Sequence, residues 1–110
     1  MDLSGRWEFS FDRTLNGQLV PTTVPHELIL IQLEATRFVG RFVFPADDPS
    51  VFEGTLHGSG RGQLFSIHQV NPSTGYHALY AGKVESAVSL SGIFIDLAGP
   101  AGDVRLRKIL

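Results

Sequence analysis

Apolar and polar residues alternate with a period of two along most of this chain, and no window of ten or more residues shows a clean helical period. In "RWEFSFD", residues 6–12, Trp7, Phe9 and Phe11 fall on one face and polar side chains on the other. Such alternation is typical of β-strands that bury one face. It predicts strands over roughly 60% of the chain, far above the average of about 20–25%. The eight expected strands are Arg6–Asp12, His26–Glu34, Arg37–Phe44, Val51–Gly58, Gln63–Val70, Tyr76–Lys83, Ala87–Leu97 and Asp103–Ile109.

With 110 residues, the chain is predicted to form one domain, residues 1–110. Most connections between the expected strands are short, so consecutive strands should pair antiparallel as an up-and-down meander. A meander of eight strands exposes two edges unless it closes on itself. We therefore predict an all-β fold, an eight-stranded antiparallel up-and-down β-barrel. The alternative is an open sandwich of two four-stranded sheets.

The prolines distinguish the two ends of this barrel. All six fall in connections that an up-and-down order places at one end, here called the mouth, and the connections at the other end contain none. Binding residues commonly lie on loops that a rigid scaffold holds, although proline collects in loops of any fold. The longest connection, residues 13–25, is a candidate lid over the mouth. The six are Pro21, Pro25, Pro45, Pro49, Pro72 and Pro100.

The parity of each strand predicts which side chains enter the barrel. Aromatic residues dominate this interior, with glycines among them that mark bends or close contacts. The strands at 26–34 and 63–70 are ambiguous because both of their faces are partly apolar, and one choice would add Ser66 and His68 to the interior. The predicted interior residues are Trp7, Phe9, Phe11, Phe38, Gly40, Phe42, Phe44, Phe52, Gly54, Leu56, Gly58, Tyr76, Ala78, Tyr80, Val88, Leu90, Gly92, Phe94, Val104 and Leu106.

The same parity leaves a set of apolar side chains on the outside of the barrel. A lone barrel in water should be mostly polar there, so a large apolar stripe predicts an interface with another subunit or a covering partner. We expect a homodimer or a higher homo-oligomer. The outward apolar residues are Val39, Val43, Leu79, Ala81, Ile93 and Ile95.

Charge and composition argue against several classes of function. The formal net charge is −2 and only nine residues are Lys or Arg, so no basic patch for nucleic acid is expected. No apolar run approaches the roughly 20 residues that span a bilayer, so no membrane partner is expected. The first residues also lack the pattern of a secretory signal. The chain has no cysteine, which excludes disulfides and thiolate metal sites and is consistent with a cytoplasmic location.

The motif "SGRW", residues 4–7, resembles the Gly-X-Trp that opens the calycins, the superfamily of lipocalins, fatty-acid-binding proteins and avidins. The resemblance implies that Trp7 lies inside the closed end of the barrel and that an Arg or Lys from the last strand packs across its ring. In "VRLRK", residues 104–108, Arg107 is the expected partner in this cation–π contact.

The chain departs from each branch of that superfamily. It is shorter than a typical lipocalin, shows no helix pair like that of fatty-acid-binding proteins, and lacks the further tryptophans that line the biotin pocket of avidins. "LSGRWEFS", residues 3–10, is also similar to a small bacterial barrel family that inhibits secreted metalloproteases. Those inhibitors insert an N-terminal tail, whereas only Met1 and Asp2 precede this segment.

Few residue groupings indicate chemistry. His57 and His68 flank a turn, but parity places His57 outside, so no metal site is expected. No phosphate loop or nucleophile elbow is present, and no cofactor is expected. His68, Tyr76 and Asp96 are expected near the mouth, where an apolar rim would raise the pKa of Asp96 and allow acid–base catalysis. The alternative is that Asp96 caps a turn through its side chain.

These patterns favour a small-molecule-binding barrel that takes a mostly apolar ligand through the mouth. The aromatic wall would be formed by Phe42, Phe52, Tyr76, Tyr80 and Phe94, and a polar end of the ligand would be oriented by His68 and Asp96. One alternative is a structural or protein-interaction barrel, including an inhibitor-like one, with a core filled by its own side chains. The other is an enzyme, a barrel-type isomerase or cyclase.

Overall fold

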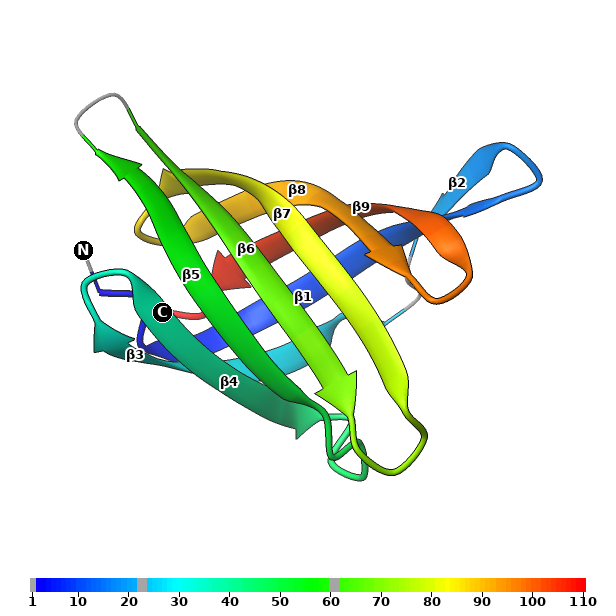
Figure 1. The fold of residues 1–110 in the computed structure, drawn as a ribbon, viewed down its shortest axis with the longest axis horizontal. Helices are drawn as coiled ribbons and strands as arrows, with labels where there is room; N and C mark the ends of the chain where they lie inside the picture. Colours follow the sequence, from blue (N-terminus) through cyan, green and yellow to red (C-terminus); the bar gives the residue numbers. More distant parts are fainter. Residues whose placement is uncertain (1, 22–23, 60–61) are drawn as a thin grey trace.

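The structure is a computed structural model that describes residues 2–21, 24–59 and 62–110. All eight predicted strands are present there, with ends that differ from the prediction by a few residues at most, and a ninth short strand is added. No helix within these ranges is long and apolar enough to cross a bilayer. The strands are β1 (Gly5–Leu15), β2 (Gln18–Pro21), β3 (His26–Glu34), β4 (Arg37–Phe44), β5 (Val51–Ser59), β6 (Gly62–Asn71), β7 (Tyr76–Ser86), β8 (Ser89–Asp96) and β9 (Gly99–Lys108) (Figure 1).

The sheet closes into a barrel, which confirms the predicted fold. Neighbouring strands follow the order β1-β3-β4-β5-β6-β7-β8-β9 and pair antiparallel, and β9 returns to pair with β1 from Gly102 to Lys108. This last pairing removes the two edges that an open meander would expose. The ninth strand, β2, pairs only with the outer end of β1 and lies outside the ring of eight.

Two glycines allow β7 and β8 to approach each other closely. Gly82 and Gly92 are directly paired across these strands. A Cβ atom added to Gly82 would lie 2.1 Å from the Ser91 carbonyl oxygen, and one added to Gly92 would lie 2.1 Å from the Ala81 carbonyl oxygen. Neither position has space for a side chain, so the two backbones approach each other as only glycine permits. The prediction that interior glycines mark close contacts is confirmed at Gly92.

The base of the barrel is the end with the connections at residues 35–36 and 87–88, and Trp7 closes it. The indole is fully buried, and its Nε1–H donates a 2.7 Å hydrogen bond to the carbonyl oxygen of Leu3. Leu3 is itself fully buried, and its own N–H donates to the side-chain oxygen of Gln32. The N-terminal segment therefore folds under the base and seals it with two apolar side chains.

The predicted cap of Trp7 is wrong. Arg107 is exposed, because Leu106 points into the barrel and the next residue must point out. The residue that approaches the base is Lys108, which pairs with Trp7 across β1 and β9. Its side chain occupies the space where a Cβ of Gly5 would lie, and its Nζ donates to the carbonyl oxygen of Asp2 at 3.3 Å. Gly5 thus makes room for a lysine side chain.

Most of the predicted interior is buried, and the exceptions lie at the ends of strands. Phe44 and Gly58 are exposed near the ends of β4 and β5, and Val88 is exposed in the turn before β8. The ambiguous strands turn Leu28 and Leu30 inward from β3, and Phe65, Ile67 and Gln69 inward from β6. Ser66 and His68 consequently face outward.

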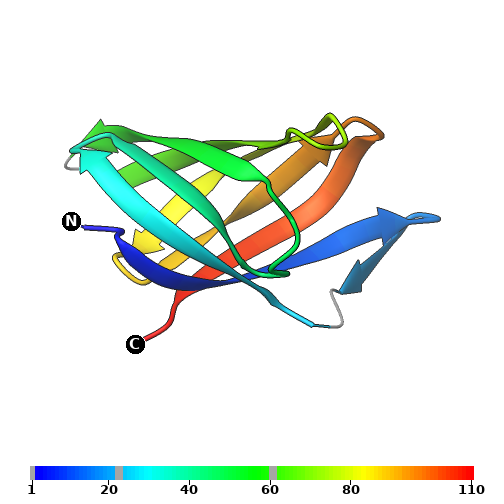
Figure 2. The same ribbon diagram turned by 90° about the horizontal axis from the view of Figure 1, so that it is seen from below.

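The mouth is the end with the connections at residues 45–50, 72–75 and 97–98. The first two of these loops contain prolines, as predicted, whereas Pro100 lies within β9. The predicted lid does not cover it. Residues 13–21 instead form a hairpin in which β1 continues to Leu15 and β2 returns, and the hairpin projects from the barrel (Figures 1 and 2). The last part of the predicted lid includes residues 22–23, which lie outside the described residues.

Several apolar side chains lie on the outer wall, as predicted. Leu79 and Ile95 are paired across β7 and β8 and are 55% and 46% exposed, and Ile93 is 64% exposed beside the exposed Ala81. We call these four residues the β7–β8 patch. The other two predicted members, Val39 and Val43, are half-buried on β4 and lie apart from it.

Candidate functional site

A cavity of about 340 Å³ opens at the mouth above the filled base. Its wall comes from the mouth-side ends of β1, β3, β4, β6, β7 and β8, together with residues from the loops at 45–50 and 72–75. The barrel is therefore filled near Trp7 and hollow near the mouth. The lining residues are Phe9, Phe11, Arg13, His26, Phe42, Asp48, Gln69, Asn71, Thr74, Tyr76, Tyr80 and Phe94.

Aromatic rings form the apolar part of this wall and pack edge to face. The Phe9 ring lies at its centre, 5.5 Å from Tyr80 and 6.3 Å from Phe42 between ring centroids. Phe11 and Phe94 extend the wall towards the opening, with centroids 5.7 Å apart. These contacts fix each ring through its neighbours, as aromatic pairs in this geometry do. The cavity keeps its shape because its wall is braced in this way.

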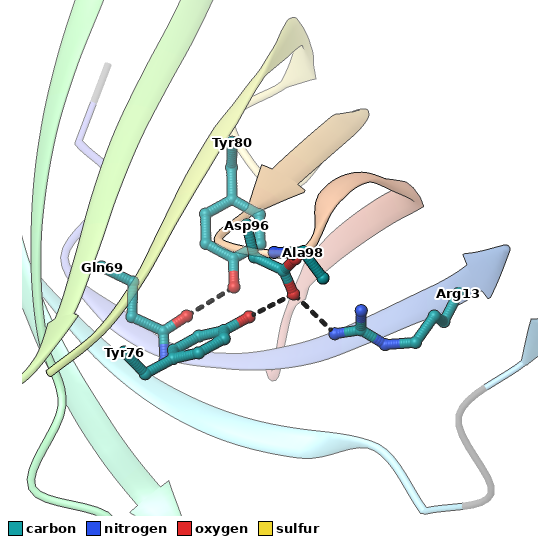
Figure 3. Close-up of polar contacts among 6 residues, drawn as sticks. All are labelled: Arg13, Gln69, Tyr76, Tyr80, Asp96 and Ala98. Atoms are coloured by element: carbon teal, nitrogen blue, oxygen red, sulfur yellow. Dashed lines mark hydrogen bonds and ion pairs between the residues drawn. The ribbon is translucent and has the colours of Figure 1, made fainter. Parts of the chain in front are cut away.

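A polar group at the rim centres on Asp96, at the end of β8 (Figure 3). Its Oδ2 accepts a 3.0 Å hydrogen bond from the Tyr76 hydroxyl and a 3.0 Å charged hydrogen bond from Nη2 of Arg13. Its Oδ1 accepts from the backbone N–H of Ala98. The Asp96 side chain is only 4% exposed, whereas that of Arg13 is 35% exposed. The carboxylate is thus buried behind its two partners, which face the cavity.

This environment fixes the charge states of the group. Burial opposes ionisation of Asp96, but the hydrogen bonds from Ala98, Arg13 and Tyr76 outweigh it and hold the pKa of Asp96 below its ordinary value. Burial likewise opposes the charge of Arg13, yet Asp96 raises the pKa of Arg13. Burial and the Asp96 charge raise the pKa of Tyr76. The prediction of a raised pKa for Asp96 is therefore wrong, because a cation lies beside it.

Arg13 is held in place on two sides. In addition to the bond to Asp96, its guanidinium carbon lies 5.5 Å from the centroid of the Phe94 ring, a cation–π contact. Arginine carries five N–H donors, and Nη2 of Arg13 uses one of them to bind Asp96. Arg13 can therefore donate to a polar group of a molecule in the cavity.

A second polar network lies deeper. The Tyr80 hydroxyl donates a short hydrogen bond to Oε1 of Gln69, and Nε2 of Gln69 donates to Oγ of Ser50 at 3.0 Å. Gln69 and Ser50 are both buried. Burial raises the pKa of Tyr80, so its hydroxyl stays protonated. The network satisfies the polar atoms beneath the aromatic wall and leaves that wall mostly apolar.

His26 lies in the wall among the rings of Phe9, Phe11 and Phe42. Its Nδ1 is buried and has no hydrogen-bond partner among the described residues. Burial lowers the pKa of His26, partly opposed by the charge of Asp48, so the ring is neutral at pH 7. It therefore adds an aromatic surface to the cavity and no charge.

The structure separates the predicted site residues into three groups. Phe42, Tyr76, Tyr80 and Phe94 line the cavity. Phe52 and Asp96 lie behind the lining, Phe52 against the Phe42 ring at 5.0 Å between centroids. The remaining predicted residue, His68, does not lie at the cavity.

His68 is exposed on the outer wall, where its Nε2 lies 2.9 Å from Nδ1 of His77. The predicted grouping of His68 with Tyr76 and Asp96 is therefore wrong, since a whole sheet separates His68 from the cavity. The acid–base arrangement inferred from these three residues does not form.

Arg13, His26 and Gln69 are among the lining residues that the prediction missed, and each follows the parity of its own strand. Arg13 continues the inward series of Trp7, Phe9 and Phe11 beyond the point where β1 was expected to end. Gln69 and His26 belong to the two ambiguous strands and take the inward parity there. Extending the alternation through polar positions would have identified Arg13, whereas the other two needed the structure.

The described residues contain no group of three or more His, Cys, Asp or Glu side chains arranged to hold a metal ion. The lining also offers no set of charged groups typical of a phosphate-bearing cofactor, because Arg13 is its one Lys or Arg residue and is paired with Asp96. The arrangement is suited to enclosing an apolar molecule and donating hydrogen bonds to it at the rim.

No protein-family model matches the chain, and no curated protein matches it. Among solved structures, it is similar to a redesigned β-barrel with a TM-score of 0.70 and 11% identity, over 98% of this chain and 92% of that one. It is also similar to the redesigned β-barrel mFAP1, bound to DFHBI, with a TM-score of 0.63, 13% identity and coverage of 96% and 94%. A de novo designed fluorescence-activating β-barrel follows, with a TM-score of 0.59, 18% identity and coverage of 96% and 93%.

At these identities the likeness shows the fold. The chain shares the closed, small antiparallel barrel of the three structures over nearly its whole length. This agrees with the calycin-like architecture that the opening motif implied, without assigning the chain to that superfamily.

Proposed function

We propose that the protein is a small-molecule-binding β-barrel that takes a mostly apolar ligand into the mouth cavity. The observation that supports this best is the aromatic cavity of about 340 Å³ above a base that is completely filled. A barrel built only as a solid scaffold gains stability by filling this space, because an empty cavity forfeits packing. The second polar network also keeps polar atoms satisfied without occupying the cavity.

The dimensions of the cavity limit the ligand. An engineered apolar cavity of about 150 Å³ holds one benzene ring, so a cavity of about 340 Å³ suits a molecule with two rings. Arg13 at the rim offers hydrogen-bond donors, while its pairing with Asp96 cancels most of its charge. The favoured ligand is therefore a neutral two-ring aromatic molecule with one polar group near the opening.

The comparison with mFAP1 supports the proposal at the level of the fold. That redesigned barrel is bound to DFHBI, so an architecture of this size is compatible with a bound small molecule. The identity of 13% transfers none of its contacts. The residues that we assign to binding here rest on the cavity of this chain.

Isothermal titration calorimetry with a series of phenols of increasing size tests the proposal. We expect 2-naphthol to bind in a saturable way, phenol to bind more weakly, and 1-hydroxypyrene not to bind, because only the first matches the volume of the cavity. Absence of saturable binding by phenol and 2-naphthol alike would contradict the proposal. It would instead favour the barrel as a structural or interaction module.

A pair of variants tests whether the ligand binds at the mouth. Thr74 lines the cavity, whereas the adjacent Ser73 is exposed in the same turn and does not. Thr74→Trp should fill the opening and weaken 2-naphthol binding about tenfold or more, a loss of roughly 1.4 kcal/mol. Ser73→Trp is the matched control and should leave the affinity unchanged. Equal effects of the two variants would place the binding elsewhere.

We also propose that the chain self-associates through the β7–β8 patch. Leu79 and Ile93 are more than half exposed and lie side by side with Ile95 and Ala81 on neighbouring strands. Burial of such a surface against a second copy is a common use of exposed apolar patches. Sedimentation should give a dimer or larger species at micromolar concentration, and Ile93→Lys should shift it towards monomer. A 12.0 kDa species for the wild type would exclude the association.

A further inference from the structure

Two histidines meet on the outer wall, on the face of the sheet opposite the cavity. His68 lies on β6 and His77 on β7, and both are exposed. Nε2 of His68 lies 2.9 Å from Nδ1 of His77, and the ring planes are inclined by 24° with centroids 5.1 Å apart. The two nitrogens thus lie within hydrogen-bonding distance, so that one can donate its N–H proton to the other.

The pairing of the strands holds the two rings together. His68 is directly opposite Leu79 and His77 is opposite Val70, so the two histidines are diagonal neighbours on one face of an antiparallel pair. Diagonal neighbours in such a pair lie within reach of long side chains. On the other side of β6, the exposed Glu53 of β5 is directly opposite His68. The pair is therefore set by the register of the barrel.

The distance between the nitrogens also matches that of two ligands on one metal ion. Imidazole nitrogens bind a metal such as zinc at about 2.0–2.1 Å, so two of them at a right angle lie about 2.9 Å apart, and at a tetrahedral angle about 3.4 Å apart. The observed 2.9 Å agrees with the right angle. Right angles between ligands are typical of square-planar and tetragonal copper(II) and nickel(II), and copper(II) binds nitrogen ligands more strongly than the other divalent ions of the series.

We propose that His68 and His77 form a two-histidine site for copper(II) on the outer wall of the barrel. The ion binds Nε2 of His68 and Nδ1 of His77, and the N–H proton between the two nitrogens moves to the other nitrogen of its ring through water. Both rings stay neutral, as metal-bound imidazoles are. Water completes the coordination.

This site is independent of the proposed ligand cavity. His68 and His77 are separated from the cavity by their own strands, whose inward residues at the same level are Gln69, Tyr76 and Ala78. Copper binding therefore does not require that 2-naphthol binds, and failure of one leaves the other in place.

Titration of the full chain with copper(II) tests the proposal, followed by calorimetry and by electron paramagnetic resonance. We expect one copper(II) ion per chain at micromolar concentration, with hyperfine couplings from two imidazole nitrogens. His68→Gln and His77→Gln should each weaken binding about tenfold or more and leave coupling from one imidazole. The emission of the buried Trp7 reports whether each variant is folded.

His57→Gln is the matched control. His57 is also an exposed histidine on the outer wall, on β5, but its Nε2 is bonded to the Ser66 hydroxyl and not to a second histidine. This variant should bind copper(II) like the wild type. Copper binding that survives both His68→Gln and His77→Gln, or that His57→Gln weakens equally, would show adventitious binding and overturn the proposal.

Discussion

At the scale of single residues, the ion pair of Arg13 with Asp96 determines the polar groups that the mouth presents. Asp96 is a buried carboxyl group in an aromatic rim, and burial alone would raise its pKa. The hydrogen bonds from Ala98, Arg13 and Tyr76 instead hold it ionised, and the side chains of Asp96, Arg13 and Tyr76 form a closed polar group. The rim therefore presents hydrogen-bond donors to the cavity.

Substitution of Asp96 tests this assignment. Asp96→Asn should lower the free energy of unfolding by about 2 kcal/mol at pH 7, because hydrogen bonds to a charged group are lost and Arg13 stays without its counter-ion. The folded-state pKa of Asp96 lies below its ordinary value of about 3.9, so this stabilisation is complete above that pH and disappears as the pH falls through the folded value. Urea denaturation should thus show a smaller difference between variant and wild type at pH 2.5.

Asp12 provides the control for that measurement. It pairs with Arg105 on the outer wall, where the arginine side chain is 51% exposed. Asp12→Asn should cost clearly less stability than Asp96→Asn, because exposed ion pairs contribute little. A loss for Asp96→Asn that is no larger than this, or that does not change with pH, would show that Asp96 is not held as a buried charge.

At the scale of elements, the alternation of residues predicted every strand of the ring but not where each one stops. Phe44 and Val88 were expected inside the barrel, yet both are exposed. They lie where strand pairing ends, and alternation no longer predicts which way a side chain points there. Arg13 shows the opposite error, since β1 continues past Asp12 with the same parity. A strand end is set by its partner strand, and the pairing of β1 with β2 cannot be derived from either segment alone.

Parity also fails where both faces of a strand are partly apolar. In β6, the choice between Gln69 and His68 decides which polar side chain enters the cavity, and the sequence of that strand supports both. The structure selects Gln69, because Phe65 and Ile67 are the larger apolar pair and Tyr80 offers a hydrogen bond to Gln69. That partner belongs to another strand, so the selection depends on tertiary packing.

The close approach of β7 and β8 at Gly82 allows a prediction at this scale. Gly82→Ala should lower the free energy of unfolding by about 3 kcal/mol, because the new methyl group would meet the Ser91 carbonyl oxygen and the strands must separate. Gly17→Ala is the control, because no atom lies within 4 Å of its added Cβ and only its φ of +78° is unfavourable. That variant should cost about 1 kcal/mol. Thermal unfolding that ranks the two equally would contradict the close approach at Gly82.

At the scale of the whole molecule, the packed core and the cavity lie at opposite ends of the barrel. The base half is filled by Trp7, Phe38, Phe65 and their neighbours, and it is closed beneath by Leu3. The mouth half has aromatic walls that brace one another around an open cavity. The closed base can therefore supply the stability that lets the mouth remain hollow.

This separation predicts opposite effects for changes at the two ends. Leu3→Ala should lower the free energy of unfolding by about 2–4 kcal/mol, because Leu3 is fully buried and seals the base against Trp7. The affinity for 2-naphthol should stay the same as long as the variant is folded, since the cavity lies at the other end. Thr74→Trp should do the reverse, with little loss of stability and weaker binding. Urea denaturation followed by Trp7 emission gives the free energy of unfolding, and calorimetry gives the affinity for 2-naphthol. For Thr74→Trp, which adds a second tryptophan, denaturation is followed by circular dichroism instead. Parallel loss of both quantities in Leu3→Ala would mean that base and mouth form one cooperative packing unit rather than two.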